Sequence, residues 1–170
     1  MIDYYDNIIS YNERQIILDQ CVKSFFKLGW LDNNLLDDKH ILNIHSSWTK
    51  DDLSKINFYP YIEDCISKSP WFKSTSPHRI ILNLVKSDDV HFIHGHPGEH
   101  VALYYANLEW QDGWYGETLF YDKNDIDKVA FTSPYKPGRI ILFDGDIPHA
   151  IRPQSIRGPK YRMSLSLFFQ

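Results

Sequence analysis

The chain has 170 residues, of which 43% are hydrophobic and 24% are charged, and its formal net charge is -4. This length fits one domain with a sizeable core and leaves little room for a second. The charge excludes a basic surface for nucleic acid or anionic membranes, and no signal peptide or bilayer-spanning segment is recognisable, so we expect a cytoplasmic protein without nucleic-acid or membrane partners.

The first strong pattern is a helix near the N-terminus. Ser10 and Glu13 have the spacing of a capping box, and apolar residues then recur at helical intervals until Gly29. The only two cysteines, Cys21 and Cys65, each lie in an apolar helical pattern. We therefore expect buried thiols rather than a disulfide or a thiolate site.

A second helical region covers residues 49–69 and predicts one or two helices. Pro60 occupies a possible first-turn position, and Pro70 ends the pattern. Two to three helices are therefore expected within about residues 1–78, where they would support the rest of the fold.

From residue 79 the pattern changes to short segments rich in β-branched and aromatic residues, separated by Gly, Pro and Asp. Six segments are predicted to be strands: residues 79–85, 101–107, 117–121, 128–132, 139–143 and 162–168. Strands at this regular spacing indicate a sandwich or jelly roll. The predicted fold is mainly β with N-terminal helices (α+β), a double-stranded β-helix (jelly roll or cupin-like barrel) at about 79–170 within a single domain of residues 1–170.

Histidines are concentrated just before the second predicted strand. Four of the eight histidines lie between residues 91 and 100. If this segment is extended, His94 and His96 project from the same face, because side chains alternate along a strand. His149 follows the predicted strand at 139–143 and could face the pair across a barrel. Neutral imidazole is the commonest protein ligand of transition metals, so these three residues predict a metal site.

The same residues also have a structural interpretation. Four histidines within ten residues are compatible with a solvated loop, and we assign His91 and His100 to that interpretation. Arg162 is likewise compatible with a surface cation on an edge strand. Residue type alone does not separate the two interpretations.

The order of motifs along the chain does separate them. His-x-His, a turn, Tyr-Tyr-x-Asn, Gly-Glu-Thr-x-Phe, Pro-Gly-Arg-x-x-x-Phe-Asp, His and Tyr-Arg-x-Ser follow one another from about His91 to Phe169. This succession resembles the iron(II)- and 2-oxoglutarate-dependent oxygenases of the prolyl 4-hydroxylase-like branch. The combination is far more specific than any one of its motifs, and it covers nearly half of the chain.

The resemblance implies roles for individual residues. His94 and His149 would be iron ligands, and Arg162 would hold the far carboxylate of 2-oxoglutarate through its planar fork. Ser164, on the same strand face, would add a hydroxyl donor. The implied cofactor is Fe(II), and the implied co-substrates are 2-oxoglutarate and dioxygen, with succinate and CO2 released as a substrate carbon is hydroxylated.

Two further positions match motifs of the family. Tyr105 matches a tyrosine whose phenol meets the same carboxylate in relatives, although it is equally suited to be a core aromatic residue. Thr118 matches a threonine that can line the co-substrate pocket. Trp110 and Trp114 lie in an intervening aromatic loop, where they either flank the substrate or pack against the N-terminal helices.

One position departs from the family pattern. Where the family most often has a carboxylate, two residues after the first histidine, this chain has His96. A neutral imidazole there leaves the iron site one unit more positive. Either His96 is the ligand or Glu99 swings in from beyond the Pro97-Gly98 turn, and strand geometry favours His96. A halogenase fits poorly, because those enzymes have a small residue at this position.

The resemblance suggests a prolyl or other peptidyl side chain, a free amino acid or a small molecule as substrate, and the sequence does not choose among these. Two other classes stay open. One is a cupin-like metal-binding protein or three-histidine metalloenzyme that uses His94, His96 and His149 without 2-oxoglutarate. The other is a structural or interaction domain with a degenerate site. Arg162 separates the first of these from the oxygenase, because a protein that does not bind 2-oxoglutarate has no need of it.

Overall fold

The computed structural model describes residues 1–30, 43–74, 76–89 and 91–170. These residues form three helices, α1 (Tyr11–Val22), α2 (Lys50–Lys55) and α3 (Tyr59–Ser67). They also form ten strands: β1 (Ile2–Tyr5), β2 (Lys27–Trp30), β3 (Asn43–Trp48), β4 (Arg79–Val85), β5 (His100–Tyr105), β6 (Thr118–Asp122), β7 (Asp125–Ser133), β8 (Ile140–Asp144), β9 (His149–Ile151) and β10 (Arg162–Phe169).

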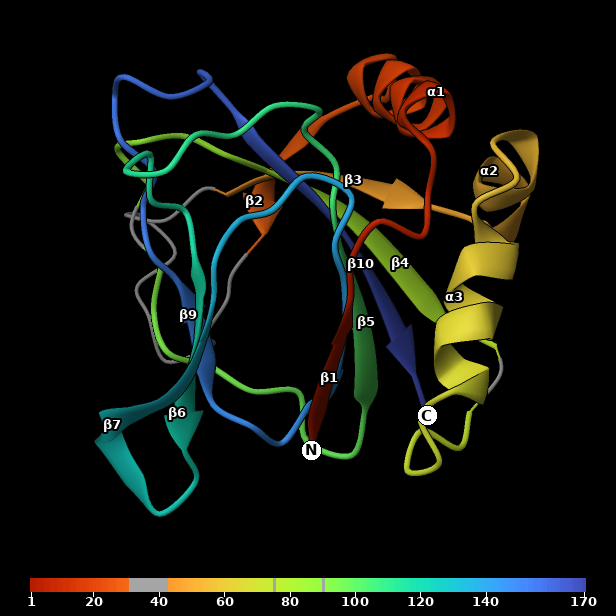
Figure 1. The fold of residues 1–170 in the computed structure, drawn as a ribbon. Coiled ribbons are helices and arrows are strands. Elements are labelled where there is room, and N and C mark those ends of the chain that lie inside the picture. The colour runs from red at the N-terminus through yellow and green to blue at the C-terminus, as the bar shows by residue number, and fades with distance from the viewer. Residues whose placement is uncertain (31–42, 75, 90) are drawn as a thin grey trace.

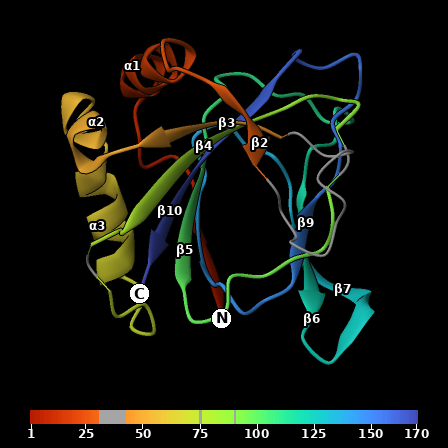
Figure 2. The ribbon, with the colours of Figure 1, turned by 180° about the vertical axis from the view of Figure 1, so that it is seen from behind.

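The strands build two antiparallel sheets that face each other. Seven described strands form the large sheet, in the order β1-β8-β5-β10-β4-β3-β2, and three form the small sheet, in the order β7-β6-β9. The helices and the small sheet lie on opposite sides of the large sheet (Figure 1), and the view from behind shows the same layers (Figure 2). The predicted jelly roll with two to three supporting helices is confirmed.

The central strands of the large sheet, β4, β5, β8 and β10, are buried on both faces, and each divides its side chains between two cores. In β10, Met163, Leu165 and Leu167 belong to the core beneath the helices, whereas Phe168 belongs to the core between the sheets. This division follows from the period of two along a strand. Every residue of β10 is buried, so its second face, which carries the polar side chains, lies inside the protein.

The capping box at the start of α1 is confirmed, but the predicted end of this helix at Gly29 is wrong. The Ser10 N–H donates to Glu13 Oε2 at 3.1 Å, and the Glu13 N–H donates to Ser10 Oγ at 3.4 Å. The helix ends at Val22, and the following residues form β2, which pairs with β3. The side chain of Phe25 is 92% exposed, so its helical spacing did not reflect burial.

The region of residues 49–69 forms α2 and α3, as expected, with Pro60 in the first turn of α3. Cys21 and Cys65 are free and buried, as expected, and burial raises the pKa of each thiol to about 12. Within the described ranges, no helix is long and apolar enough to cross a bilayer.

The six predicted strands correspond to β4, β5, β6, β7, β8 and β10. Three strands lie in the region that we expected to be only helical, and β1 and β3–β2 extend opposite ends of the large sheet. Their short segments lack an alternating apolar pattern. β1 pairs with β8 and β3 pairs with β4, both distant in sequence, and β2 pairs with β3.

Candidate functional site

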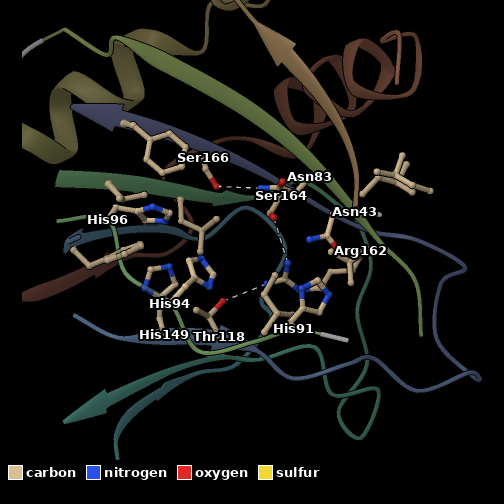
Figure 3. A pocket seen from close by; sticks show the side chains of 18 residues that line it. Asn43, Asn83, His91, His94, His96, Thr118, His149, Arg162, Ser164 and Ser166 are labelled. Carbon is tan, nitrogen blue, oxygen red and sulfur yellow. Dashed lines mark hydrogen bonds between the residues drawn. The ribbon is translucent and has the colours of Figure 1, made fainter. Parts of the chain in front are cut away.

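A cavity of about 60 Å3 lies between the two sheets. Figure 3 shows three imidazoles gathered at one end and Arg162 toward the other, with Thr118 and Ser164 on opposite walls between them. The walls come from β3, β4, β5, β8 and β10 of the large sheet and from β6 and β9 of the small sheet. This volume is well below the roughly 300–1,000 Å3 of pockets for drug-sized ligands, so a ligand held here must be small.

The three histidines predicted as metal ligands are brought together. One ring nitrogen from each of His94, His96 and His149 lies within 4.8 Å of the other two. The ring centroids are 4.5–5.1 Å apart. Nitrogens that bind one ion at about 2.1 Å must lie within roughly 4 Å of one another, so a small adjustment of the rings is enough to share an ion.

Backbone pairing places two of these rings next to each other. The His94 N–H donates to His149 O at 3.0 Å, and the His149 N–H donates to His94 O at 2.8 Å. His149 begins β9, but His94 forms only this isolated bridge. The segment of residues 94–96 is therefore not a regular strand as we expected, although both of its histidine side chains reach the cavity.

A glycine in the turn after β8 fixes the position of His96. The His96 N–H donates to Gly145 O at 2.7 Å, and the Gly145 N–H donates to Glu99 O at 2.8 Å. A Cβ atom at Gly145 would lie 2.5 Å from His96 O and 2.6 Å from Glu99 O. Only glycine therefore permits the turn to lie this close to residues 96–99.

Hydrogen bonds select the tautomer of two of the rings. His94 Nδ1 is 3.0 Å from Phe92 O, and His149 Nδ1 is 2.8 Å from Ile147 O. Since a carbonyl only accepts, each Nδ1 carries the proton, and each Nε2 presents its lone pair to the cluster. This is the arrangement that metal-binding histidines need, so the donor set fits a divalent transition metal.

Of the two residues considered for the remaining ligand, only His96 lies in the cluster. The Glu99 carboxylate is bound by His78 Nε2 at 2.8 Å and by Arg79 Nη2 at 2.9 Å. Its Oε2 atom is 3.9 Å from His96 Nδ1. Glu99 therefore stands behind His96 rather than beside it.

Arg162 is fully buried, so the interpretation as a surface cation is wrong. Its Nε–H donates to Gly116 O at 2.8 Å, Nη1 donates to Ser164 Oγ at 3.2 Å, and Nη2 donates to Thr118 Oγ1 at 3.2 Å. One N–H on each terminal nitrogen is left over. None of the salt bridges among the described residues involves Arg162. Burying a charge without a partner is costly, so this cation is suited to an anion from outside the chain.

The other predicted co-substrate residues surround this guanidinium. Ser164 and Thr118 line the cavity. Tyr105 does not line it, and its hydroxyl donates to Thr118 Oγ1 at 2.7 Å. The Arg162 guanidinium also lies 5.1 Å from the Tyr105 ring centroid and 4.9 Å from that of Tyr135. Tyr105 thus supports Arg162 from behind, and its direct contact with a co-substrate stays a prediction.

Trp110 of the aromatic loop packs against the core between the sheets and not against the N-terminal helices, whereas its place beside a substrate stays a prediction. The Trp110 and Tyr135 ring centroids are 4.1 Å apart, and Trp110 Nε1–H donates to Tyr115 O at 2.8 Å. Gly116 has a φ of +81°, and a Cβ atom there would lie 2.9 Å from Trp110. The loop therefore needs glycine at the residue whose carbonyl accepts from Arg162.

Four further polar side chains line the cavity and were missed: Asn43, Asn83, His91 and Ser166. Ser166 shares a strand face with Ser164, so the period of two was a usable signal. Asn43 lies in the region predicted to be helical and gave no signal. The solvated-loop assignment is wrong for His91, which lines the cavity, and for His100, which is partly buried against Trp71 and Phe72.

No family model matches the sequence, and no curated protein sequence matches it. Solved structures do match. A prolyl-4-hydroxylase from Pseudomonas putida is 12% identical, with a TM-score of 0.72 over 99% of this chain and 92% of that one. A Trichoplax adhaerens prolyl hydroxylase, solved with a peptide fragment of the hypoxia inducible factor oxygen degradation domain, is 15% identical, with a TM-score of 0.70 over 99% and 82%.

A third match has a different activity. A non-heme alpha ketoglutarate dependent epimerase from nogalamycin biosynthesis is 12% identical, with a TM-score of 0.70 over 99% of this chain and 77% of that one. Prolyl hydroxylases and the epimerase therefore share one architecture, and the present chain has the same fold.

Proposed function

We propose that this protein is an Fe(II)- and 2-oxoglutarate-dependent dioxygenase that hydroxylates a substrate carbon and releases succinate and CO2. One observation carries the proposal. Arg162 is buried without a carboxylate partner, and it lines the same cavity as a cluster of three histidines. A metal site and an anion site at two ends of one cavity match a small ligand that carries a chelating group and a distant carboxylate.

His94, His96 and His149 would hold the iron. Neutral imidazoles suit Fe(II), and the carbonyls behind His94 and His149 favour the tautomer of each neutral ring that has its proton on Nδ1 and its lone pair on Nε2. Bound iron supplies the redox chemistry that couples dioxygen to the oxidation of 2-oxoglutarate and of the substrate. The protein contributes orientation and a cavity shielded from water.

Arg162 and Ser164 would bind the far carboxylate of 2-oxoglutarate. The two remaining N–H groups of the guanidinium match the two oxygens of a carboxylate, and the Ser164 hydroxyl lies 3.2 Å from Nη1. Thr118 would fix the guanidinium from the opposite wall, and Tyr105 would fix Thr118. The 2-oxo and adjacent carboxylate groups would then reach toward the histidines.

The substrate is proposed at the level of its class: a peptidyl prolyl residue, another side chain or a small molecule. The similar structures include a prolyl hydroxylase with a bound peptide and an epimerase, so the fold accepts both kinds of substrate. The proposal treats residues 1–170 as one dioxygenase domain of a cytoplasmic protein.

A second candidate function is that of a three-histidine metalloenzyme or cupin-like metal-binding protein without 2-oxoglutarate. The absence of a carboxylate from the cluster of described metal-binding residues favours it. This candidate does not explain why a buried cation lines the cavity, so we rank it second.

The test is an anaerobic titration of the iron-loaded protein with 2-oxoglutarate, followed through the visible charge-transfer band of the chelate. We expect this band, and slow succinate formation once air is admitted. Glutarate, which lacks the 2-oxo group, is the control and should give no band. Iron binding without a band and without succinate would reject the dioxygenase and favour the second candidate.

A further inference from the structure

Glu99 lies directly behind His96, and its place suggests a role that depends on the proposed function. We propose that Glu99 is a positioning residue: it orients His96 and supplies, from outside the metal's ligand set, the negative charge that three neutral imidazoles lack. His96 and Glu99 would thus act together as a histidine–carboxylate pair at the metal.

Each of the three imidazoles has an oxygen atom facing its Nδ1, but the kind of oxygen differs. His94 Nδ1 and His149 Nδ1 face backbone carbonyls at 3.0 and 2.8 Å, whereas His96 Nδ1 faces Glu99 Oε2 at 3.9 Å. The group behind His96 is therefore the charged one. At 3.9 Å the Glu99 carboxylate lies beyond direct hydrogen-bonding distance of Nδ1 and acts on the dipole of the neutral ring through its field. Outer partners of a ligating imidazole tune its orientation and basicity.

Glu99 is fixed at this place and is not free to swing into the cavity. Its carboxylate is held by Arg79 at 2.9 Å and by His78 at 2.8 Å, and its side chain is only 17% exposed. A turn closed by the Glu99 N–H on His96 O at 3.0 Å holds the backbone, and Gly98 in this turn has a φ of +77°. Direct ligation by Glu99 would require the loss of a partly buried ion pair with Arg79 and of the contact with His78.

The side chains around His96 make its surroundings sensitive to charge. The Arg79 guanidinium lies 3.8 Å from the Phe168 ring centroid, and the Phe168 ring meets the His96 ring edge-on at 4.8 Å. Arg79 is therefore close to the cluster. Removing the charge of Glu99 would take away one negative unit and would leave the Arg79 cation near the metal without this counter-charge.

The test is a titration of the metal-free protein with Co(II), followed through its visible absorption bands and by competition with a chelator. Glu99→Gln keeps the shape of the side chain and removes its charge, and we expect a 10- to 100-fold weaker Co(II) affinity, the range typical of outer partners of metal ligands, with bands at the wild-type positions. Glu99→Asp keeps the charge and should retain most of the affinity.

Glu117→Gln is the matched control, because Glu117 is 19% exposed and also lies near an arginine, Arg152, at 3.7 Å. It should bind Co(II) like the wild type. His96→Ala should lower the affinity further and shift the bands, because it removes a donor atom. Thermal unfolding of each metal-free variant shows whether a loss of affinity comes from a loss of fold.

Two outcomes would overturn the role of Glu99. An affinity of Glu99→Gln equal to that of Glu117→Gln would show that its charge does not act on the metal. Shifted bands, as in His96→Ala, would show that Glu99 is itself a ligand. If Glu99→Gln does not fold, proton NMR of wild-type Co(II) protein decides: we expect three hyperfine-shifted, exchangeable imidazole N–H signals, and two would contradict the proposal.

The same experiment separates this inference from the proposed function. Suppose that the wild type binds Co(II), that Glu99→Gln binds it more weakly, and that the iron-loaded wild type does not respond to 2-oxoglutarate. This result would reject the dioxygenase and leave the role of Glu99 intact. A wild-type protein that binds no Co(II) would reject both.

Discussion

Two buried arginines, Arg139 and Arg162, are surrounded very differently. Arg139 is 8% exposed and donates from Nε and Nη2 to the two carboxylate oxygens of Asp6, at 2.8 and 2.9 Å. Arg162 is 0% exposed and donates only to neutral oxygens. The first cation has its counter-charge within the chain, whereas the second opens on a cavity that also contains three histidines.

The aromatic surroundings of the two arginines are alike. Arg139 lies 4.6 Å from the ring centroid of Tyr4, and Arg162 lies 4.9 Å from that of Tyr135. Each also donates to a serine hydroxyl, Ser133 or Ser164. The packing around Arg139 and Arg162 is therefore similar, and the difference between the two arginines is the Asp6 carboxylate, which Arg139 contacts and Arg162 does not. Removal of the carboxylate from a buried pair leaves an uncompensated charge, so the fold depends on the carboxylate of Asp6. Arg162 has no such carboxylate in the part of the chain that the structure describes, and we therefore propose an external anion as its partner.

The largest effect is expected for Arg162→Met. Loss of the cation that we propose for the far carboxylate should weaken 2-oxoglutarate binding by at least ~100-fold, or about 3 kcal/mol. The free energy of unfolding without ligand should be unchanged or higher, because an apolar side chain replaces an unpaired buried charge. Titration with 2-oxoglutarate and urea unfolding measure the two quantities. If Arg162→Met binds 2-oxoglutarate with the wild-type affinity, Arg162 is not the anion-binding arginine that we propose.

Asp6→Asn tests the other arginine and should act on stability alone. It leaves the Arg139 charge largely buried without its carboxylate, and we expect a loss of about 2 kcal/mol, below the range for fully buried pairs because Asp6 is partly exposed. Urea unfolding measures the loss. Binding of 2-oxoglutarate should stay at the wild-type level, and a large drop in affinity would show that the two arginines are coupled.

The Asp6–Arg139 pair also predicts a dependence on pH. Hydrogen bonding from Arg139 holds the pKa of Asp6 below its ordinary value. A lowered pKa in the folded state stabilises the protein above the unfolded pKa of about 3.9, and this contribution is lost as the pH falls through the folded value. The difference in unfolding free energy between wild type and Asp6→Asn should thus be constant from pH 7 to 5 and shrink below about pH 4. A difference that grows on acidification would reverse the assigned sign.

The smallest effects are expected for the two serines. Ser164→Ala should weaken 2-oxoglutarate binding by about 1 kcal/mol, roughly fivefold, with little effect on stability. Ser133→Ala is the matched control and should lower stability by about as much without changing the affinity. Equal effects of both variants on binding would show that the hydroxyl of Ser164 has no special role.

The face of β10 that lines the cavity could be predicted from the sequence. The Tyr-Arg-x-Ser motif lies in a strand-like segment, and a period of two places Ser164 on the same face as Arg162, as the structure shows. The same period applies to Ser166, which we did not use. Local geometry suffices here because neighbouring residues of one strand keep their relation wherever the strand lies.

The carboxylate next to the metal cluster could not be predicted in this way. Glu99 was a candidate ligand, and its actual place depends on Arg79 and His78 at the start of β4 and on the turn around Gly145. The place of Trp110 behind Arg162 likewise depends on Tyr135. These partners are distant in sequence, so no local pattern contains the information.

The sequence by itself determined the mainly β fold, the helix start at Ser10, most of the core strands and the identities of the three histidines and Arg162. These features depend on periodicity, capping and motif order, which act over a few residues. The tertiary structure decided the edge strands β1, β2 and β3, the end of α1, and which buried cation has a carboxylate. Each of those depends on a partner from another part of the chain, which only folding brings within hydrogen-bonding or ion-pair distance.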